Sequence, residues 1–307
     1  MLISWLFVGC LSGILYSLSI PAVDIGILAW ICLVPSLLLA LHPNSSNANV
    51  IRIWMLGLAT GLAAGTGRVY WVGETLVNYG GLNQIQALLT TCALVVYIAL
   101  YPAFFFLICR SLPINNPFFS WLAAAIWVML DWAQSWIATG FPWQQIGYSQ
   151  HLNLPVLQFA SVTGIYGLSF IVVLVNAALT QAFLIRHRHF ICIMPIIITI
   201  TVIVGFGKYR ISTLQSTVDP DHARIAIIQG NISQDIKWKM DRIAYTTNHY
   251  VKLTREFVSA PEAIKQYDLI VFPETALPFF LTDPVYSSYL EQVSDLAREL
   301  DTPILIG

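Results

Sequence analysis

Charged side chains are scarce in this chain of 307 residues: Asp, Glu, Lys and Arg make up only 10% of it, and the formal net charge is −1. Globular proteins typically contain about 25% charged residues. Hydrophobic residues reach 57%, and the mean hydropathy is +0.71. This shortage of charge excludes a protein that is water-soluble throughout and an intrinsically disordered chain. The lack of a basic surface also argues against nucleic acid as a partner.

Cysteine is scarce too, and it is unevenly placed. The last 100 residues contain none, and the sequence has no Cys-x-x-Cys pair. The sequence therefore predicts neither a disulfide scaffold nor a Cys-x-x-Cys metal site. The five cysteines lie in or beside apolar segments: Cys10, Cys32, Cys92, Cys109 and Cys192.

The few charges divide the chain into two parts. Residues 1–207 hold eight of the 31 charged side chains, whereas residues 208–307 hold 23. Lipid is the solvent that suits the first part, and water suits the second. We therefore predict a membrane all-α helical domain over 1–207, followed by a water-exposed domain over 208–307.

Apolar segments in the first part have the length of membrane spans, which take about 20 residues each. The sixth is longer than a span needs, so we expect its start to lie at the membrane interface. We predict seven spans: Leu2–Ile20, Ile25–Leu41, Ile53–Trp71, Ile85–Cys109, Phe118–Thr139, Val156–Ile185 and Phe190–Phe206.

The positive charges between these spans predict the orientation. Cytoplasmic loops are enriched in Lys and Arg, and here the even-numbered loops carry them, with Arg68 as the ambiguous case. The N-terminus is therefore expected in the cytoplasm, and seven spans then deliver residues 208–307 to the opposite face, which in a bacterium is extracytoplasmic. The basic residues concerned are Arg52, Arg110, Arg186 and Arg188.

Three charged residues lie within or beside the spans. Asp131 falls in the fifth span, and Arg68 and Glu74 flank the end of the third. Ionisable groups at membrane depth suggest function, so a proton or substrate relay is one interpretation. A structural pairing near the membrane interface is the favoured alternative, because all three lie close to span ends.

The loop at residues 140–150 differs from the other connections. It is uncharged and aromatic, and it contains glycine, proline and three glutamines. On the outer face it could contribute to a cleft that faces lipid, or it could be a plain re-entrant connection. Composition leaves both interpretations open.

The second part alternates short apolar runs with amphipathic ones. This alternation predicts an α/β sheet whose strands are joined by helical crossovers. The expected elements are a strand over 224–229, a helix over 241–258, a strand over 268–272, a helix over 285–300 and a strand from 303 to 306.

Ligands in such sheets gather beyond the carboxyl ends of the strands. Residues 230–238 and 273–278 occupy these positions. Glu274 follows an apolar strand and stands between Pro273 and Pro278, so we expect it to be rigidly held and partly desolvated, as suits a general base. A loop glutamate that pairs with a lysine or caps the next helix is the equally weighted alternative.

Three of these motifs resemble the apolipoprotein N-acyltransferase family, whose catalytic domain belongs to the nitrilase superfamily. They are the Phe-Pro-Trp-Gln-Gln-Ile-Gly-Tyr-Ser-Gln loop at 141–150, the stretch from Gln229-Gly230-Asn231 to Lys237-Trp238, and Phe-Pro-Glu-Thr-Ala-Leu-Pro at 272–278. The resemblance runs over essentially the whole chain. It implies that the outer domain is an α/β nitrilase-type (αββα) domain, of which residues 208–307 form the N-terminal portion.

The resemblance also implies an activity. The family transfers an acyl chain from a phospholipid to the N-terminal amine of a diacylglyceryl apolipoprotein, through a thioester on a cysteine and with a Glu-Lys-Cys triad. The resemblance thus implies phospholipid and apolipoprotein as partners, in a bacterial inner membrane with the outer domain on the periplasmic side, and no metal or soluble cofactor is required. Glu274 matches the family's general base, and Trp238 matches a tryptophan near the substrate cleft.

The chain departs from the family at its end. The family's catalytic lysine and cysteine follow the glutamate, whereas this chain stops at Gly307, and Lys237, Lys239, Lys252 and Lys265 all precede Glu274. We therefore expect a truncated chain that is inactive alone. A membrane-anchored amide hydrolase of the same superfamily and a transporter or sensor with an outer domain remain as alternatives.

Overall fold

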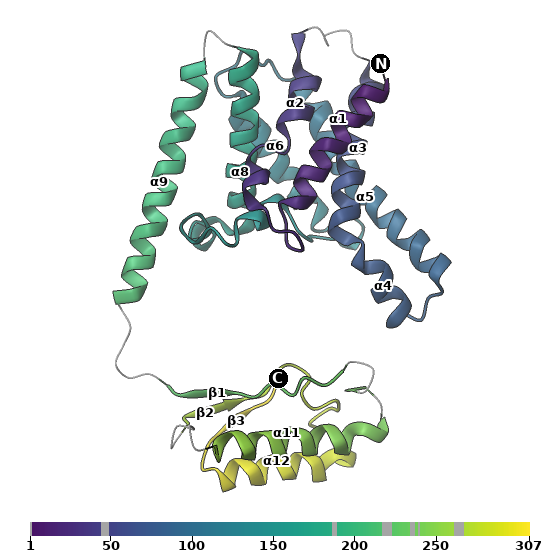
Figure 1. The fold of residues 1–307 in the computed structure, drawn as a ribbon, viewed down its shortest axis with the longest axis vertical. Helices are drawn as coiled ribbons and strands as arrows, with labels where there is room; N and C mark the ends of the chain where they lie inside the picture. The colour runs from purple at the N-terminus through teal and green to yellow at the C-terminus, as the bar shows by residue number, and fades with distance from the viewer. Residues whose placement is uncertain are drawn as a thin grey trace. The chain divides into compact units, whose positions relative to one another are not determined.

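The computed structural model describes residues 2–43, 49–185, 189–216, 223–233, 237–238, 240–260 and 267–307. Two compact units emerge, Met1–Thr217 and Val218–Gly307 (Figure 1). The first is built from helices, and the second is a small α/β unit.

Long apolar helices dominate the first unit. Four stretches are long and apolar enough to cross a membrane within the described residues: Val50–Val69, Gln84–Ser111, Ala160–Leu184 and Cys192–Leu214. The helices of this unit are α1 (Leu2–Leu18), η1 (Gly26–Trp30), α2 (Val34–Leu41), α3 (Val50–Val69), α4 (Trp71–Asn78), α5 (Gln84–Ser111), α6 (Phe119–Gln134), η3 (Ile137–Thr139), η4 (Ile146–Gln150), α7 (Leu154–Leu157), α8 (Ala160–Leu184) and α9 (His189–Ser216).

The second expected span, Ile25–Leu41, is not one regular α-helix. It divides into the 3₁₀ helix η1 and the helix α2. The buried side chain of Asn176 on α8 stabilises the break: its Oδ1 accepts from the backbone N–H of Leu33 at 2.9 Å, and its Nδ2 donates to the carbonyl oxygen of Ala29 at 2.8 Å. An amide side chain from a distant helix thus pairs backbone groups that a regular helix would pair internally.

The fifth and sixth expected spans also differ from single helices. The helix α6 ends at Gln134 instead of Thr139, because Ala138 and Thr139 take left-handed backbone conformations with φ of 53° and 73°. The sixth segment is divided into α7 and α8, and Gly164 within α8 has a φ of 62° and a non-helical backbone. These turns create irregular backbone between α6 and α8, where the 140–150 loop lies.

Small residues let α3 pack closely between α1 and α5. A Cβ on Gly13 of α1 would lie 2.3 Å from the carbonyl oxygen of Thr60, and a Cβ on Gly61 of α3 would lie 2.5 Å from the Cα of Ala99. Glycine is required at both positions because the partner is backbone, which cannot move aside. Small residues at helix contacts are typical of association within membranes.

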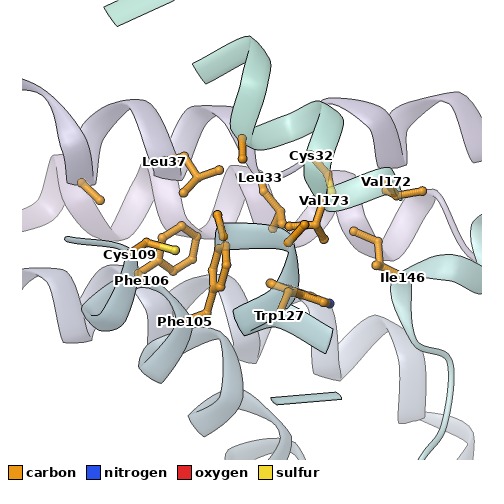
Figure 2. Packing of buried hydrophobic residues seen from close by; sticks show 14 of the residues in the cluster. Cys32, Leu33, Leu37, Phe105, Phe106, Cys109, Trp127, Ile146, Val172 and Val173 are labelled. Carbon is orange, nitrogen blue, oxygen red and sulfur yellow. The ribbon is translucent and has the colours of Figure 1, made fainter. Parts of the chain in front are cut away.

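The core of the first unit is shared by α1, α2, α3, α5, α6 and α8, and Figure 2 shows part of it. The rings of Phe105 and Trp127 meet edge to face with centroids 4.9 Å apart, as aromatic pairs prefer. Val172 and Val173 of α8 are buried in the same cluster. Ile146 of the 140–150 loop is fully buried there, which joins this loop to the core.

The second unit contains a three-stranded parallel sheet in the order β1-β2-β3. The strands are β1 (Ile225–Ile227), β2 (Leu269–Val271) and β3 (Ile304–Leu305), with the helices α11 (Ile243–Val258) and α12 (Ser287–Glu299) and the short turns η6 (Met240–Arg242) and η7 (Pro284–Tyr286) between them. The two helices lie on one face of the sheet (Figure 1). The alternation of strands and helices expected from the sequence is confirmed, with each element inside its expected range.

The two faces of this sheet differ in burial. Ala226 and Ile270 pair across β1 and β2 and are buried against the helices. Because side chains alternate along a strand, their neighbours point to the opposite face. Ile225, Ile227 and Leu305 there remain 50%, 74% and 55% exposed. One face of the sheet is thus packed against the helices, whereas the opposite face is apolar and exposed.

Candidate functional site

Glu274 lies directly beyond β2, at the carboxyl edge of the sheet. The backbone N–H of Phe272 still donates to Leu305 at 2.8 Å, and the N–H of Thr275 donates to the carbonyl oxygen of Gly307 at 2.9 Å. Thr275 has a φ of 54°, a left-handed conformation that residues other than glycine adopt at a cost. The chain therefore turns sharply at Glu274, and its backbone is held by the neighbouring strand.

The side chain of Glu274 is exposed, so the expectation of partial desolvation is wrong for the described residues. The turn at Thr275 directs the chain away from the sheet, and the buried residues of this segment are instead Phe272, Ala276 and Leu277. The carboxylate is accessible to a reacting group from solvent.

Lys237 reaches the Glu274 turn from the loop that follows β1. Its Nζ donates to the hydroxyl oxygen of Thr275 at 2.6 Å and to the backbone carbonyl oxygen of Glu274 at 3.4 Å. The two residues are 37 positions apart in the sequence, and the adjacent parallel strands bring them together. This contact could not be predicted from the sequence, although both loops were expected at the same edge. Lys237 thus fixes the turn that carries the general-base candidate.

Gly230 begins the same loop and is pressed against α11. A Cβ there would lie 2.6 Å from the ring of Tyr250, so a side chain would displace that ring from the core. The Nε2 of His249 lies 3.0 Å from the carbonyl oxygen of Gly230 and donates to it in the tautomer protonated at that nitrogen. Burial raises the pKa of Tyr250 from its ordinary value. The neutral phenol therefore packs beside Phe272 and ties the loops after β1 and β2 to one core.

Trp238, the second site residue expected from the sequence, is 56% exposed. Residues 234–236 of the same motif lie outside the described residues. The described neighbour Lys237 contacts the Glu274 turn, which places the end of this motif at the sheet edge. The exposed indole of Trp238 is available to a ligand.

The 140–150 loop of the first unit is held by side chains from several helices. Trp143 and Tyr148 stay 47% and 42% exposed, while Gln145 and Ile146 are buried. The loop thus presents some aromatic rings and inserts other side chains into the bundle. Its anchoring hydrogen bonds run from Gln134 Nε2 to Phe141 O (2.9 Å), from Arg68 Nη2 to Trp143 O (2.6 Å), from Tyr16 OH to Gln144 O (3.4 Å) and from Gly147 N to Ser169 Oγ (3.2 Å).

The structure brings together two of the three charged residues singled out in the spans. Arg68 and Asp131 are only 5% and 6% exposed, and both line one small cavity of about 10 Å³. The guanidinium carbon of Arg68 also lies 4.9 Å from the centre of the Tyr16 ring. Glu74 is not part of this cluster and lies on α4.

A groove of about 690 Å³ is lined by the C-terminal end of α3, by α4 and by the first half of α5. Its size falls within the range of about 300–1,000 Å³ that is usual for small-molecule sites. Apolar residues such as Leu62, Val77, Leu88 and Val95 line most of it, and Glu74 is the one formal charge among its described lining residues. This groove could not be predicted from the sequence, because both of its walls look like ordinary apolar helices.

The comparisons with known proteins agree on one protein family. The family model for the apolipoprotein N-acyltransferase N-terminal domain matches residues 12–178, more than half of the chain. A similar protein from Geobacter metallireducens is named apolipoprotein N-acyltransferase and is 34% identical over 313 residues, which cover 97% of this chain and 56% of the relative. Relatives of the same name from Vibrio cholerae and Shewanella oneidensis are 32% and 31% identical, and they cover 88% and 78% of this chain. Since 50% and 44% of these two relatives are matched, the chain spans about half the length of the curated relatives.

Proposed function

Because this chain belongs to the apolipoprotein N-acyltransferase family, we propose that it is part of a membrane enzyme that moves an acyl chain from a phospholipid to the N-terminal amine of a diacylglyceryl apolipoprotein. The observation that carries this proposal is the Glu274 turn. An exposed carboxylate stands on a backbone fixed by β3 and by Lys237, at the edge of a parallel sheet where ligands gather.

Glu274 acts in this proposal as the general base. It takes the proton of a cysteine thiol, and the thiolate attacks the ester carbonyl of the phospholipid. The carbon–oxygen bond breaks, and the lysophospholipid oxygen receives the proton back from Glu274. In the second half the apolipoprotein amine attacks the thioester, loses a proton to Glu274 and displaces the sulfur, which is reprotonated.

The cysteine and the oxyanion-stabilising lysine of this scheme are not assigned within the 307 residues. All five cysteines lie in the helical unit. Lys237 donates to the turn backbone and to Thr275, a role in holding the turn. The activity is therefore proposed for the complete protein, and we expect residues 1–307 alone to form no thioester.

We propose further that residues 208–307 begin a nitrilase-type αββα domain. In that architecture two sheets are stacked face to face between outer helices. The open apolar face formed by Ile225, Ile227 and Leu305 supports this, because it has the character of a surface that packs against a second sheet. We propose that residues 1–207 form seven spans with the N-terminus in the cytoplasm and the second unit in the periplasm. The arginines of the even loops support that orientation.

The helical unit supports a lipid substrate. The groove between α3–α4 and α5 is mostly apolar, as an acyl chain requires, and the 140–150 loop exposes Trp143 and Tyr148, residues that favour the membrane–water interface.

A product assay tests this function directly. The complete protein, in detergent, receives a phospholipid labelled in its acyl chains and a peptide with an N-terminal diacylglyceryl cysteine. We expect lysophospholipid and an amide-linked acyl peptide to form together, one for one. Release of labelled free fatty acid without acyl peptide, or ammonia release from amide substrates, would instead identify a hydrolase and overturn the proposal.

A further inference from the structure

The cluster around Arg68 lies at the junction of four segments of the helical unit. Arg68 belongs to α3, Tyr16 to α1, Asp131 to α6 and Trp143 to the 140–150 loop. The Nη2 of Arg68 donates to the carbonyl oxygen of Trp143 at 2.6 Å. A charged donor at this distance makes one of the stronger hydrogen bonds available to a backbone carbonyl.

Two features keep the guanidinium in this position. The ring of Tyr16 lies under it at 4.9 Å, a cation–π arrangement, and the carboxylate of Asp131 attracts it across the small cavity that both line. A buried charge in a membrane unit is costly unless it is paired. The chain accepts this cost at a point where Arg68 donates a hydrogen bond to the backbone of Trp143.

The backbone of this loop needs such an anchor. Gln144, the next residue, has a φ of 51°, which is a left-handed conformation. The Tyr16 hydroxyl donates to the carbonyl oxygen of Gln144 at 3.4 Å, a long hydrogen bond. The Arg68 contact is the short one that fixes this part of the loop. The exposed ring of Trp143 then rests against Trp71 at 5.4 Å, just beyond the end of α3.

We propose that Arg68 is a positioning residue: through the Trp143 carbonyl it holds the 140–150 loop so that the Trp143 ring contacts the acyl-donor phospholipid. Trp71, which supports that ring, begins α4, and α4 lines the apolar groove beside α5. The chemistry of the ligand is an acyl chain with its ester at the membrane surface. This inference rests on the proposed function for the identity of the donor, but the anchoring of the loop is independent of it.

The test uses the complete protein in nanodiscs and two readouts, hydrogen exchange of residues 140–150 and the kinetics with phospholipid. In Arg68→Met we expect amide exchange around Trp143 to rise at least about tenfold, as for a locally opened segment. We expect KM for the phospholipid to rise by about tenfold, while kcat at saturation changes less than about twofold. Arg68→Lys should restore part of both effects, because an ammonium still donates to the carbonyl.

Two further variants separate anchoring from stability. Thr60→Val removes another buried polar group of α3, whose hydroxyl donates to Leu56, and should leave both readouts unchanged. Trp143→Leu should raise KM while the loop keeps its protection, since only the ring is lost. This variant also decides the question if Arg68→Met fails to fold.

Normal exchange in Arg68→Met, or an unchanged KM in Trp143→Leu, would overturn the inference. A wild-type protein that forms no acyl product from phospholipid would refute the proposed function and the donor role of Trp143 with it. The exchange experiment would still decide whether Arg68 anchors the loop.

Discussion

At the scale of single residues, buried polar side chains determine where the helical unit departs from regular helices. Asn176 pairs the backbone on both sides of the break between η1 and α2, and Arg68 pairs the backbone of the 140–150 loop. Neither role could be predicted from the sequence, because each side chain acts on a segment more than 70 positions away. An asparagine or arginine in an apolar run signals a partner but does not identify it.

Asn176→Leu should destabilise the helical unit strongly. The change preserves size but removes the partner of the buried N–H of Leu33, at about 1–3 kcal/mol, and leaves the carbonyl oxygen of Ala29 with the weak thiol donor of Cys32 at 3.4 Å. We expect a lower thermal midpoint for the protein in detergent. Thr180→Val, which removes a hydroxyl that donates to the backbone of Asn176 within α8, is the matched control and should change the midpoint much less. Equal midpoints for both variants would contradict the assigned role.

Asp268 makes the local stability of the second unit depend on pH. Its carboxylate accepts the backbone N–H of Arg224 at 2.7 Å, which lowers the pKa of Asp268 in the folded state. A lowered folded pKa means that the stabilisation is present above the unfolded pKa of about 3.9 and is lost as the pH falls through the folded value. Protection of the Arg224 amide, corrected for intrinsic exchange, should therefore decline below about pH 4. In Asp268→Asn this pH dependence should disappear, and its persistence would assign the effect to another group.

At the scale of elements, α3 is the centre of the helical unit because glycines bring it against its neighbours. Gly61→Val should separate α3 from α5, since even a Cβ would lie 2.5 Å from the Cα of Ala99. We expect a loss of about 1–3 kcal/mol, the usual cost of overpacking, read as a lower thermal midpoint. Gly205→Val on α9, where a Cβ meets nothing within 4 Å, is the control. A normal midpoint for Gly61→Val would mean that these helices can move apart freely.

The elements of the second unit could be predicted better than those of the first. Short apolar runs that alternate with amphipathic ones locate β1, β2 and β3 and the helices between them, since each strand buries its own residues locally. In the helical unit the apolar runs locate the spans, but their breaks depend on distant groups such as Asn176. Only part of the candidate site could be predicted. The position of Glu274 follows from its place after β2, whereas the contact from Lys237 depends on the pairing of β1 with β2.

At the scale of the whole molecule, the proposed topology places the two ends of the chain on opposite sides of the membrane. In a variant whose five cysteines are replaced, Thr282→Cys in the second unit should react with a membrane-impermeant maleimide in intact spheroplasts. Asn49→Cys, in an even-numbered loop, should react only after lysis. Both positions are exposed, so burial does not explain a difference. The reverse labelling pattern would overturn the orientation and place Glu274 in the cytoplasm.

The central claim is that Glu274 is the general base of acyl transfer from phospholipid. The measurement that tests it most directly is the formation of the acyl-enzyme by the complete protein after incubation with acyl-labelled phospholipid, detected as hydroxylamine-labile label on the protein. Glu274→Gln keeps the shape of the side chain but cannot take a proton, and its exposure means that little folding energy is at stake. We predict label on the wild-type protein and a loss of at least about 10²-fold in its rate of formation in the variant, as is usual for general-base catalysis. Label that forms at the wild-type rate in Glu274→Gln would contradict the account.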